Sequence, residues 1–203
     1  MRARGLVGAI LVLSVGAGSG CSAPAGGIRP AGADPRIGLF SFVEEGNLVL
    51  LVASTRAARY RSDRPYFPVE IVVANKGLAS LTLTPESFAL VDPGGKEYAP
   101  VGRDELARSY GGTDVDRRFG ELEAVLGAKL AEYTRVPCNL TPDFDDPIAR
   151  DRLFLPRFGY IRDFLYFPRP EGGVAHRALE LTLRAPELPE PVFVRFVVLP
   201  REG

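Results

Sequence analysis

Apolar and polar residues alternate along several short stretches of the chain. Between residues 179 and 184, three leucines alternate with Glu180, Thr182 and Arg184. Successive side chains of a β-strand point to opposite faces, so this pattern predicts a strand with one buried face. A shift of register by one residue would expose the leucines, at a cost of roughly 1.5–3 kcal/mol for each. The same alternation occurs in three further predicted strands, and in each it places the apolar residues on one face. The three sets are Val69, Ile71 and Val73; Leu81 and Leu83; and Val194, Phe196 and Val198.

Turn residues separate these stretches in the manner of consecutive hairpins. Residues 44–47 separate predicted strands over 37–43 and 48–54, and residues 92–95 separate those over 88–91 and 97–99. Proline and glycine in the second turn supply the fixed and positive φ values that tight turns need. Because the strands are apolar on one face, they favour antiparallel sheets packed face to face over a parallel α/β sheet. The sequence therefore predicts an all-β fold, an antiparallel β-sandwich.

The β pattern is interrupted over residues 101–160. Apolar residues at intervals of three and four predict a helix over 120–133, and its stripe consists of Leu122, Val125, Leu126, Leu130 and Tyr133. Residues 103–110 predict a shorter helix, and residues 135–150, rich in proline and aspartate, predict a loop. We therefore expect a partly helical insertion between the strands of the sandwich.

The stretch 69–100 carries a further motif. An alternating strand ends at Asn75, a second strand leads to Pro85-x-x-Phe88, and a hairpin that begins at Asp92 and contains Gly95 precedes Tyr98. In these residues the stretch resembles the telokin-like, immunoglobulin-like domain of many uncharacterised secreted bacterial proteins and lipoproteins. The segment 164–168 and the leucine-alternating strand after it are similar to the second half of that family. The resemblance implies an immunoglobulin-like sandwich and no particular activity.

The amino-terminal segment is typical of an exported protein. Arg2 and Arg4 precede an uncharged stretch of small and apolar residues, 5–18. This stretch is too short to cross the roughly 30 Å of bilayer hydrocarbon, which needs about 20 apolar residues. The segment that ends at Cys21 resembles a bacterial lipoprotein signal, in which two small residues precede the acylated cysteine. The resemblance implies a signal peptide over 1–20 and lipidation of Cys21.

The mature protein is expected to consist of a tether over 21–35 and a sandwich domain over 36–200. The tether is nearly all serine, alanine, glycine and proline, a composition that cannot bury enough apolar surface to fold. Two or three acyl chains would make attachment effectively permanent. Ser22 is not the aspartate that retains lipoproteins at the inner membrane, so the resemblance implies the outer membrane, on its periplasmic or surface face. The alternative is an ordinary secretory peptide and a soluble periplasmic or secreted protein.

Charge and cysteine content narrow the expected partners. The chain has 25 basic and 25 acidic residues, and loss of residues 1–20 would remove two arginines, which leaves 23 − 25 = −2. A nucleic-acid-binding protein needs a basic field that this balance does not provide. Acylation of Cys21 would leave Cys138 without a partner in the chain, so we expect no structural disulfide.

Residues suited to catalysis or metal binding are few. His176 is the only histidine, and although it could pair with Cys138, nothing around that cysteine marks an activated thiol. One histidine and one cysteine fall short of a zinc site, so we expect no cofactor or metal. An acidic run of aspartates could offer oxygen ligands to Ca²⁺, but it departs from the twelve-residue calcium loop at Ile148 and Phe154. A solvated loop is the favoured interpretation, and an irregular calcium site is the alternative. The run consists of Asp143, Asp145, Asp146 and Asp151.

The segment 150–170 combines aromatic rings with arginines, which is the composition of protein–protein hot spots. The candidate partner-binding residues are Phe154, Arg157, Phe158, Tyr160 and Arg162. The alternative is that the rings lie buried under the inserted helix while the arginines face water. A second arginine-rich stretch, 56–64, could touch an anionic surface, although a solvated loop is the favoured interpretation.

These patterns predict a non-enzymatic cell-envelope lipoprotein that binds a protein partner or has a structural role. The alternative is a carbohydrate-binding or carboxylate-dependent hydrolytic envelope protein, since 25 acidic residues readily supply pairs of carboxylates. A pocket lined by two facing acids would favour the alternative, whereas a solid sandwich would favour the first hypothesis.

Overall fold

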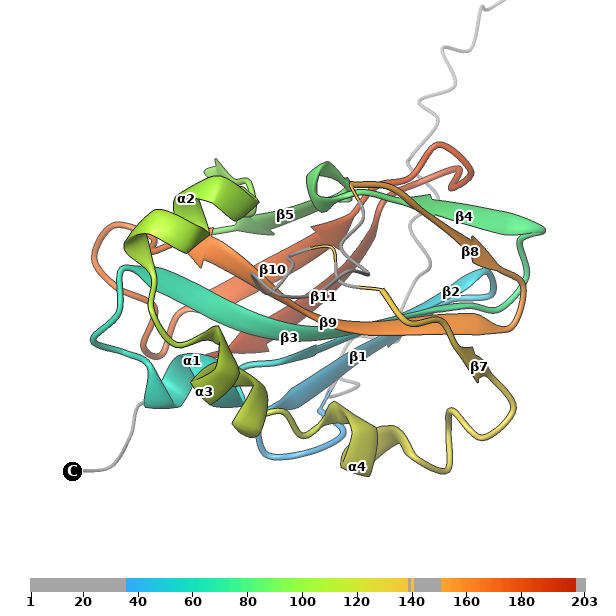
Figure 1. Cartoon of the computed structure of the whole chain (residues 1–203), viewed down its shortest axis with the longest axis horizontal. Helices are drawn as coiled ribbons and strands as arrows, with labels where there is room; N and C mark the ends of the chain where they lie inside the picture. Colours follow the sequence, from blue (N-terminus) through green and yellow to red (C-terminus); the bar gives the residue numbers. More distant parts are fainter. Residues whose placement is uncertain (1–35, 139, 141–150, 200–203) are drawn as a thin grey trace, which may run out of the picture.

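The computed structural model describes residues 36–138, 140 and 151–199, whose strands form two facing sheets and one short pair (Figure 1). The first sheet has the order β1-β2-β3-β9-β7 and the second β11-β10-β5-β6, while β4 pairs with β8. Among the described strands, only β7 and β9 pair in parallel. The bounds are β1 Ser41–Glu45, β2 Val49–Ser54, β3 Tyr66–Asn75, β4 Ser80–Leu83, β5 Phe88–Val91, β6 Glu97–Tyr98, β7 Thr134–Arg135, β8 Leu153–Pro156, β9 Gly159–Pro168, β10 Ala178–Leu183 and β11 Val192–Val197.

The interior lies between the two sheets and contains the residues that alternation placed on buried faces. Leu179, Leu181 and Leu183 of β10 are at most 1% exposed, and Leu181 lies opposite Val194 of β11. On the other face of the same strand, Glu180 accepts a hydrogen bond from Arg195 at 3.0 Å. The prediction of an antiparallel β-sandwich is therefore confirmed.

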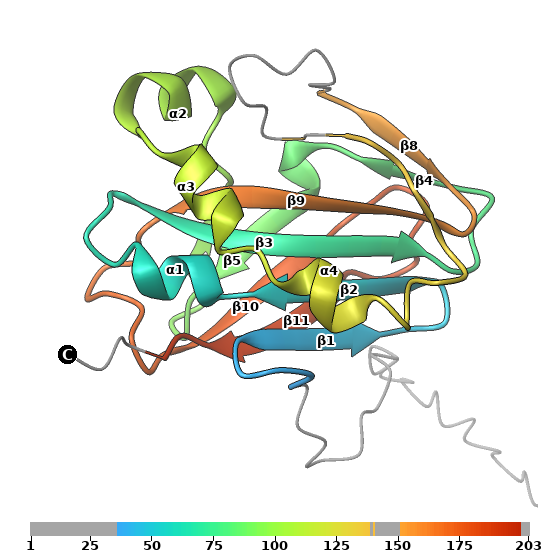
Figure 2. The same ribbon diagram turned by 60° about the horizontal axis from the view of Figure 1, so that its bottom comes forward.

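The five-stranded sheet is buried on both faces at β2 and β3, so the expectation of one-sided strands is wrong for these two strands. Every residue of β2 and of β3 is buried. On β3, Ile71 and Val73 face the interior of the sandwich, whereas Val72 and Ala74 pack outward against a second apolar cluster. Figure 2 shows α1, α3 and α4 lying across the outer face of β2 and β3. The domain thus has three layers: a helical layer, the five-stranded sheet and the four-stranded sheet.

The helical layer is built from short helices. The predicted helix over 120–133 forms only as α4, which ends at Leu126; the next residue is Gly127, and glycine lowers helix stability by about 1 kcal/mol relative to alanine. Leu122, Leu126 and Leu130 are buried as the stripe predicted, but Val125 is 39% exposed. Helices of this length do not persist alone, so packing on the sheet holds them. The helices are α1 Arg56–Tyr60, α2 Arg103–Ser109, α3 Thr113–Arg118 and α4 Leu122–Leu126.

Two stretches that were expected to be loops contain regular structure. The stretch 56–64 includes α1, whose Ala57 and Ala58 are buried, so a fully solvated loop is the wrong interpretation. The start of the predicted 135–150 loop belongs to β7. The proposed signal peptide, Cys21, the tether and most of the acidic run lie outside the described residues. No helix in the described part of the chain is long and apolar enough to cross a membrane.

Candidate functional site

The candidate partner-binding residues lie on β8, on the turn that follows it and on the first half of β9. Leu153 and Leu155 of β8 are buried in the interior, whereas Phe154 between them is 63% exposed. Arg157 and Phe158 form the turn into β9, and Phe158 is 49% exposed. We refer to Phe154, Arg157 and Phe158 as the β8–β9 tip.

Phe158 has an unusual backbone conformation that hydrogen bonds hold in place. Its φ is 59°, in the left-handed region that favours glycine. Its N–H donates to the carbonyl of Asn75 at 2.8 Å, and its carbonyl accepts from the N–H of Thr134 at 2.8 Å. The exposed ring meets Tyr133 edge-on at 6.2 Å between centroids, and the guanidinium of Arg157 lies 5.0 Å from its centre. The tip thus presents an aromatic ring from a fixed position.

Tyr160 and Arg162 are on the outer face of β9, toward the helical layer. Tyr160 is partly buried against the cluster that includes Leu122 and Leu126. Arg162 donates from Nε to Glu70 at 2.6 Å, and its side chain is 20% exposed. These two candidates therefore hold the helical layer on the sheet, and only the tip residues are prominently exposed.

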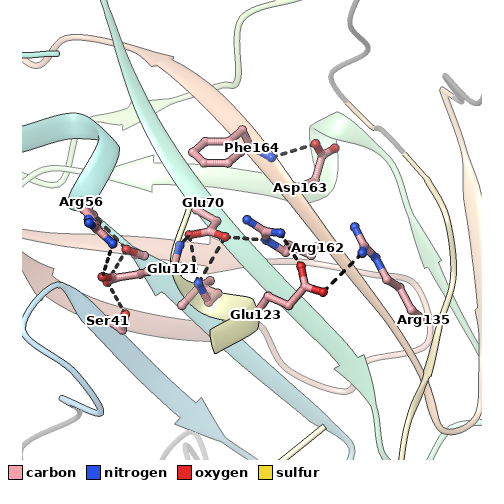
Figure 3. Close-up of polar contacts among 11 residues, drawn as sticks. Ser41, Arg56, Glu70, Glu121, Glu123, Arg135, Arg162, Asp163 and Phe164 are labelled. Atoms are coloured by element: carbon pink, nitrogen blue, oxygen red, sulfur yellow. Dashed lines mark hydrogen bonds and ion pairs between the residues drawn. The ribbon is translucent and has the colours of Figure 1, made fainter. Parts of the chain in front are cut away.

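Glu70 is the centre of a buried polar network under α4 (Figure 3). Although it is 1% exposed, its carboxylate accepts from Arg162 and from the backbone N–H groups of Glu121, at 2.8 Å, and Leu122, at 3.3 Å. The two backbone donors lie at the amino-terminal end of α4. Together with Arg162 they compensate the cost of burying the charge of Glu70. The signal in the sequence was a glutamate inside the apolar run of β3, which the alternation argument did not use.

Glu121 extends this network to the first two strands. It accepts hydrogen bonds from the hydroxyls of Ser41, at 2.6 Å, and Ser54, at 2.9 Å, and it lies 3.7 Å from the guanidinium of Arg56. Both serines are fully buried. The side chain thereby connects β1, β2 and α1 to the insertion, so the arrangement is structural.

A small pocket opens beside Arg162, and its cavity volume is about 120 Å³. It lies where α3, β7 and β9 meet, and we call it the arginine pocket; its lining consists of Arg117, Arg135, Arg162, Asp163 and Phe164. Asp163 is buried and accepts from the backbone N–H groups of Leu140, at 2.5 Å, and Phe164, at 2.7 Å. Sequence reasoning did not bring these arginines together, because they lie on three separate elements.

The carboxylate of Glu123 lies between two of the pocket arginines. It accepts from Nη1 of Arg162 at 2.8 Å and is 3.8 Å from Nη1 of Arg135 (Figure 3). Its side chain is 63% exposed and that of Arg135 is 51% exposed. The site can therefore hold a carboxylate between guanidinium groups at the protein surface.

A second buried cluster joins α3 to the residues that end α1 and α2. The fully buried Asp116 pairs with Arg61 at 2.8 Å and accepts from the hydroxyl of Tyr110 at 2.6 Å. Burial raises the pKa of Asp116 and that of Tyr110 above their ordinary values. Because Arg61 is only 11% exposed and bound to this carboxylate, it serves the fold and not an anionic surface.

The remaining chemical candidates lie in separate settings. Cys138 is buried in the interior between the sheets, whereas His176 lies in the turn before β10, where its N–H donates to the carbonyl of Val198 at 3.0 Å. Of the acidic run, only Asp151 is described, and it is exposed. Within the described ranges, no group of three or more histidine, cysteine, aspartate or glutamate side chains is arranged to hold a metal ion.

The geometry defines a β-sandwich with a helical layer on one sheet, an exposed aromatic tip and a small arginine-lined pocket. Comparisons of the chain with protein-family models, with curated proteins and with solved structures find no match.

Proposed function

We propose that this chain is a lipid-anchored, non-enzymatic module of the bacterial cell envelope that binds a protein partner through the β8–β9 tip. The observation that carries the proposal is Phe158, whose ring is half exposed although its backbone is in the left-handed region. A residue other than glycine pays roughly 1–2 kcal/mol for that conformation. An exposed ring gains little by burial, and its contacts with Tyr133 and Arg157 do no more than offset this cost, so a net gain in fold stability does not account for a phenylalanine here.

The chemistry of the tip suits a protein partner. Phe154 and Phe158 offer apolar area, and Arg157 stacks over one of the rings. Aromatic residues and arginine are the side chains most enriched at the centres of protein interfaces. The backbone bonds of Phe158 to Asn75 and Thr134 fix the backbone that carries the ring before binding, which reduces the entropy lost on association.

The proposed immunoglobulin-like family is supported by the structural roles of the residues that carry the resemblance. The side-chain amide of Asn75 donates to the carbonyls of Leu78 and Leu155, both at 3.0 Å. Asp92 accepts from the N–H groups of Gly94 and Lys96 and so closes the hairpin turn. Because these residues form turns and strand ends, they support a proposal about the fold and carry no information about the partner.

The proposed anchor is tested by metabolic labelling with radioactive palmitate in a bacterial host. We expect label in the mature protein, its loss in Cys21→Ser and its retention in the matched variant Cys138→Ser. Acylation at Cys21 would place the domain at a membrane, by our proposal the outer one. Absence of label from the unaltered chain would leave the alternative, a soluble exported protein.

Partner binding is tested by photocrosslinking in cells with benzoylphenylalanine at position 158. Phe193 on β11 is a matched control, because it is 40% exposed and Arg195 lies 5.3 Å from its ring centre. We expect one discrete adduct from position 158, lost on Arg157→Ser, and none from position 193. Equal adducts from both positions, or none from 158, would contradict the proposed binding surface.

The buried acids do not favour the hydrolytic alternative. Glu70 and Asp116 are each bound to an arginine, and Asp163 is bound by backbone N–H groups. These carboxylates therefore stabilise the junction of the insertion with the sheet. Their donors occupy the oxygens that an acid–base pair would need for substrate.

A further inference from the structure

We propose that the arginine pocket binds a small oxyanion, a carboxylate or phosphate group, in the position that the carboxylate of Glu123 occupies in this structure. The pocket lies between α3, β7 and β9, and Glu123 contacts two of its arginines, Arg135 and Arg162. Guanidinium groups are well suited to hold such anions, since their planar donors match two oxygens at once.

Glu123 has the properties of an internal ligand that can be displaced. Its side chain is 63% exposed, and its carboxylate forms ion pairs with Arg135 and Arg162 (Figure 3). Exposed ion pairs of this kind contribute little to stability, so turning the side chain into water costs the fold little. By contrast, Glu70 is buried under α4 and stays bound to Nε of Arg162. Arg162 therefore keeps its orientation when Glu123 leaves.

The pocket arginines lose one negative neighbour when Glu123 turns into water. Three arginines and Asp163 line the pocket, and Glu70 and Glu123 bind Arg162 beside it. Without Glu123, Arg135 and Nη1 of Arg162 lose the carboxylate that they share and can hold an entering anion instead. The buried carboxylate of Asp163 opposes entry, so we expect the binding to be weak.

The space that Glu123 leaves sets the size of the ligand group. The adjoining pocket is small, about 120 Å³, and the departing carboxylate frees room for a group of about its own size. That space suits acetate, inorganic phosphate or the end of one acidic side chain. The ligand class is therefore a small oxyanion, whether free or carried by a larger molecule. This inference does not depend on the β8–β9 tip having a partner.

The test is a titration of the purified, ¹⁵N-labelled full chain, followed by NMR through the Nε–H signal of Arg162. Sodium acetate and inorganic phosphate are added in separate arms, each against sodium chloride at the same ionic strength. We expect a saturable shift in at least one arm. Glu123→Gln removes the competing carboxylate and should tighten binding about two- to fivefold, the range set by an exposed ion pair.

A second variant and a matched control complete the experiment. Arg135→Gln should weaken binding at least threefold, because it removes one of the two guanidinium groups that hold Glu123. Arg195→Gln, at an exposed ion pair with Glu180 on the other sheet, should leave the affinity unchanged. No saturable shift in either arm, or weaker binding by Glu123→Gln, would overturn the proposal. Equal effects of Arg135→Gln and Arg195→Gln would also overturn the proposal, because they would show that the anions screen surface charge in general and do not bind at the pocket.

Discussion

Replacing Phe158 with glycine separates a contribution of this residue to the fold from one to binding. Glycine adopts a φ of 59° without the penalty of roughly 1–2 kcal/mol that a β-carbon imposes. The variant loses the edge contact with Tyr133, worth about 0.5–1.5 kcal/mol, and the exposed contact with Arg157, worth about 0.5–1 kcal/mol. The relief of the backbone penalty and the loss of the two ring contacts nearly cancel. We expect the free energy of unfolding to change by less than about 1 kcal/mol.

The assay is urea unfolding followed by far-UV circular dichroism. Phe158→Ala is the matched control, because it loses the ring but keeps the backbone penalty, and it should be about 1 kcal/mol less stable than Phe158→Gly. Phe67→Ala gives the scale for a structural ring, since Phe67 is fully buried and its truncation should cost about 3–5 kcal/mol.

Two outcomes would refute this reasoning. A loss of more than about 2 kcal/mol in Phe158→Gly would mean that the ring holds the turn together, and the main support for the β8–β9 tip as a binding surface would disappear. An alanine variant as stable as the glycine variant would mean that the backbone conformation carries no penalty. The expected result is a stable Phe158→Gly protein that no longer binds its partner.

Two further predictions concern the charged residues of the fold. Glu70→Gln leaves Arg162 without its buried charged partner. The free energy of unfolding should fall by an amount near the lower end of about 3–5 kcal/mol, since Arg162 is 20% exposed. Urea unfolding measures this loss, and a loss below about 1 kcal/mol would contradict the prediction. Hydrogen bonds from Lys129 and Lys76 hold the pKa of Glu45 below its ordinary value of 4.5, so its contribution to stability is present above pH 4.5 and is lost as the pH falls through the lowered pKa. The unaltered chain should therefore be more stable than Glu45→Gln near neutral pH, and this difference in stability should vanish in acid and shrink in 1 M salt. A difference that grows in acid would contradict the direction of the pKa shift.

Alternation predicted the strands well where one face meets water. For β10 and β11 it assigned the inward residues as the structure has them, because a wrong register would bury charge, although Thr182 on the outward face of β10 is also buried. For β3 it correctly placed Val69, Ile71 and Val73 on the interior face, but it missed that Val72 and Ala74 form a second buried face where polar residues were expected. That extra apolar content was the sign of a covered outer face. The pattern could not identify the cover, which comes from residues some fifty positions later in the chain.

The site was harder to predict than the fold for a related reason. The exposed rings of Phe154 and Phe158 were among the candidates, because aromatic residues near arginines are visible in a local stretch of sequence. The arginine pocket was not among the candidates, since Arg117 and Arg135 meet Arg162 only after the chain folds. The short helix α1 was missed because its arginines resembled a solvated loop, although two alanines between them are buried.

The attachment of α4 to Glu70 means that the insertion is an integral part of the domain. A shortened chain without residues 101–133 would leave Leu50 and Val72 open to water, beside a Glu70 carboxylate that keeps Arg162 but loses its two backbone donors. Such a protein would be prone to aggregate and would not reduce to a smaller stable sandwich. We therefore expect β3 and the inserted segment to have changed together during evolution.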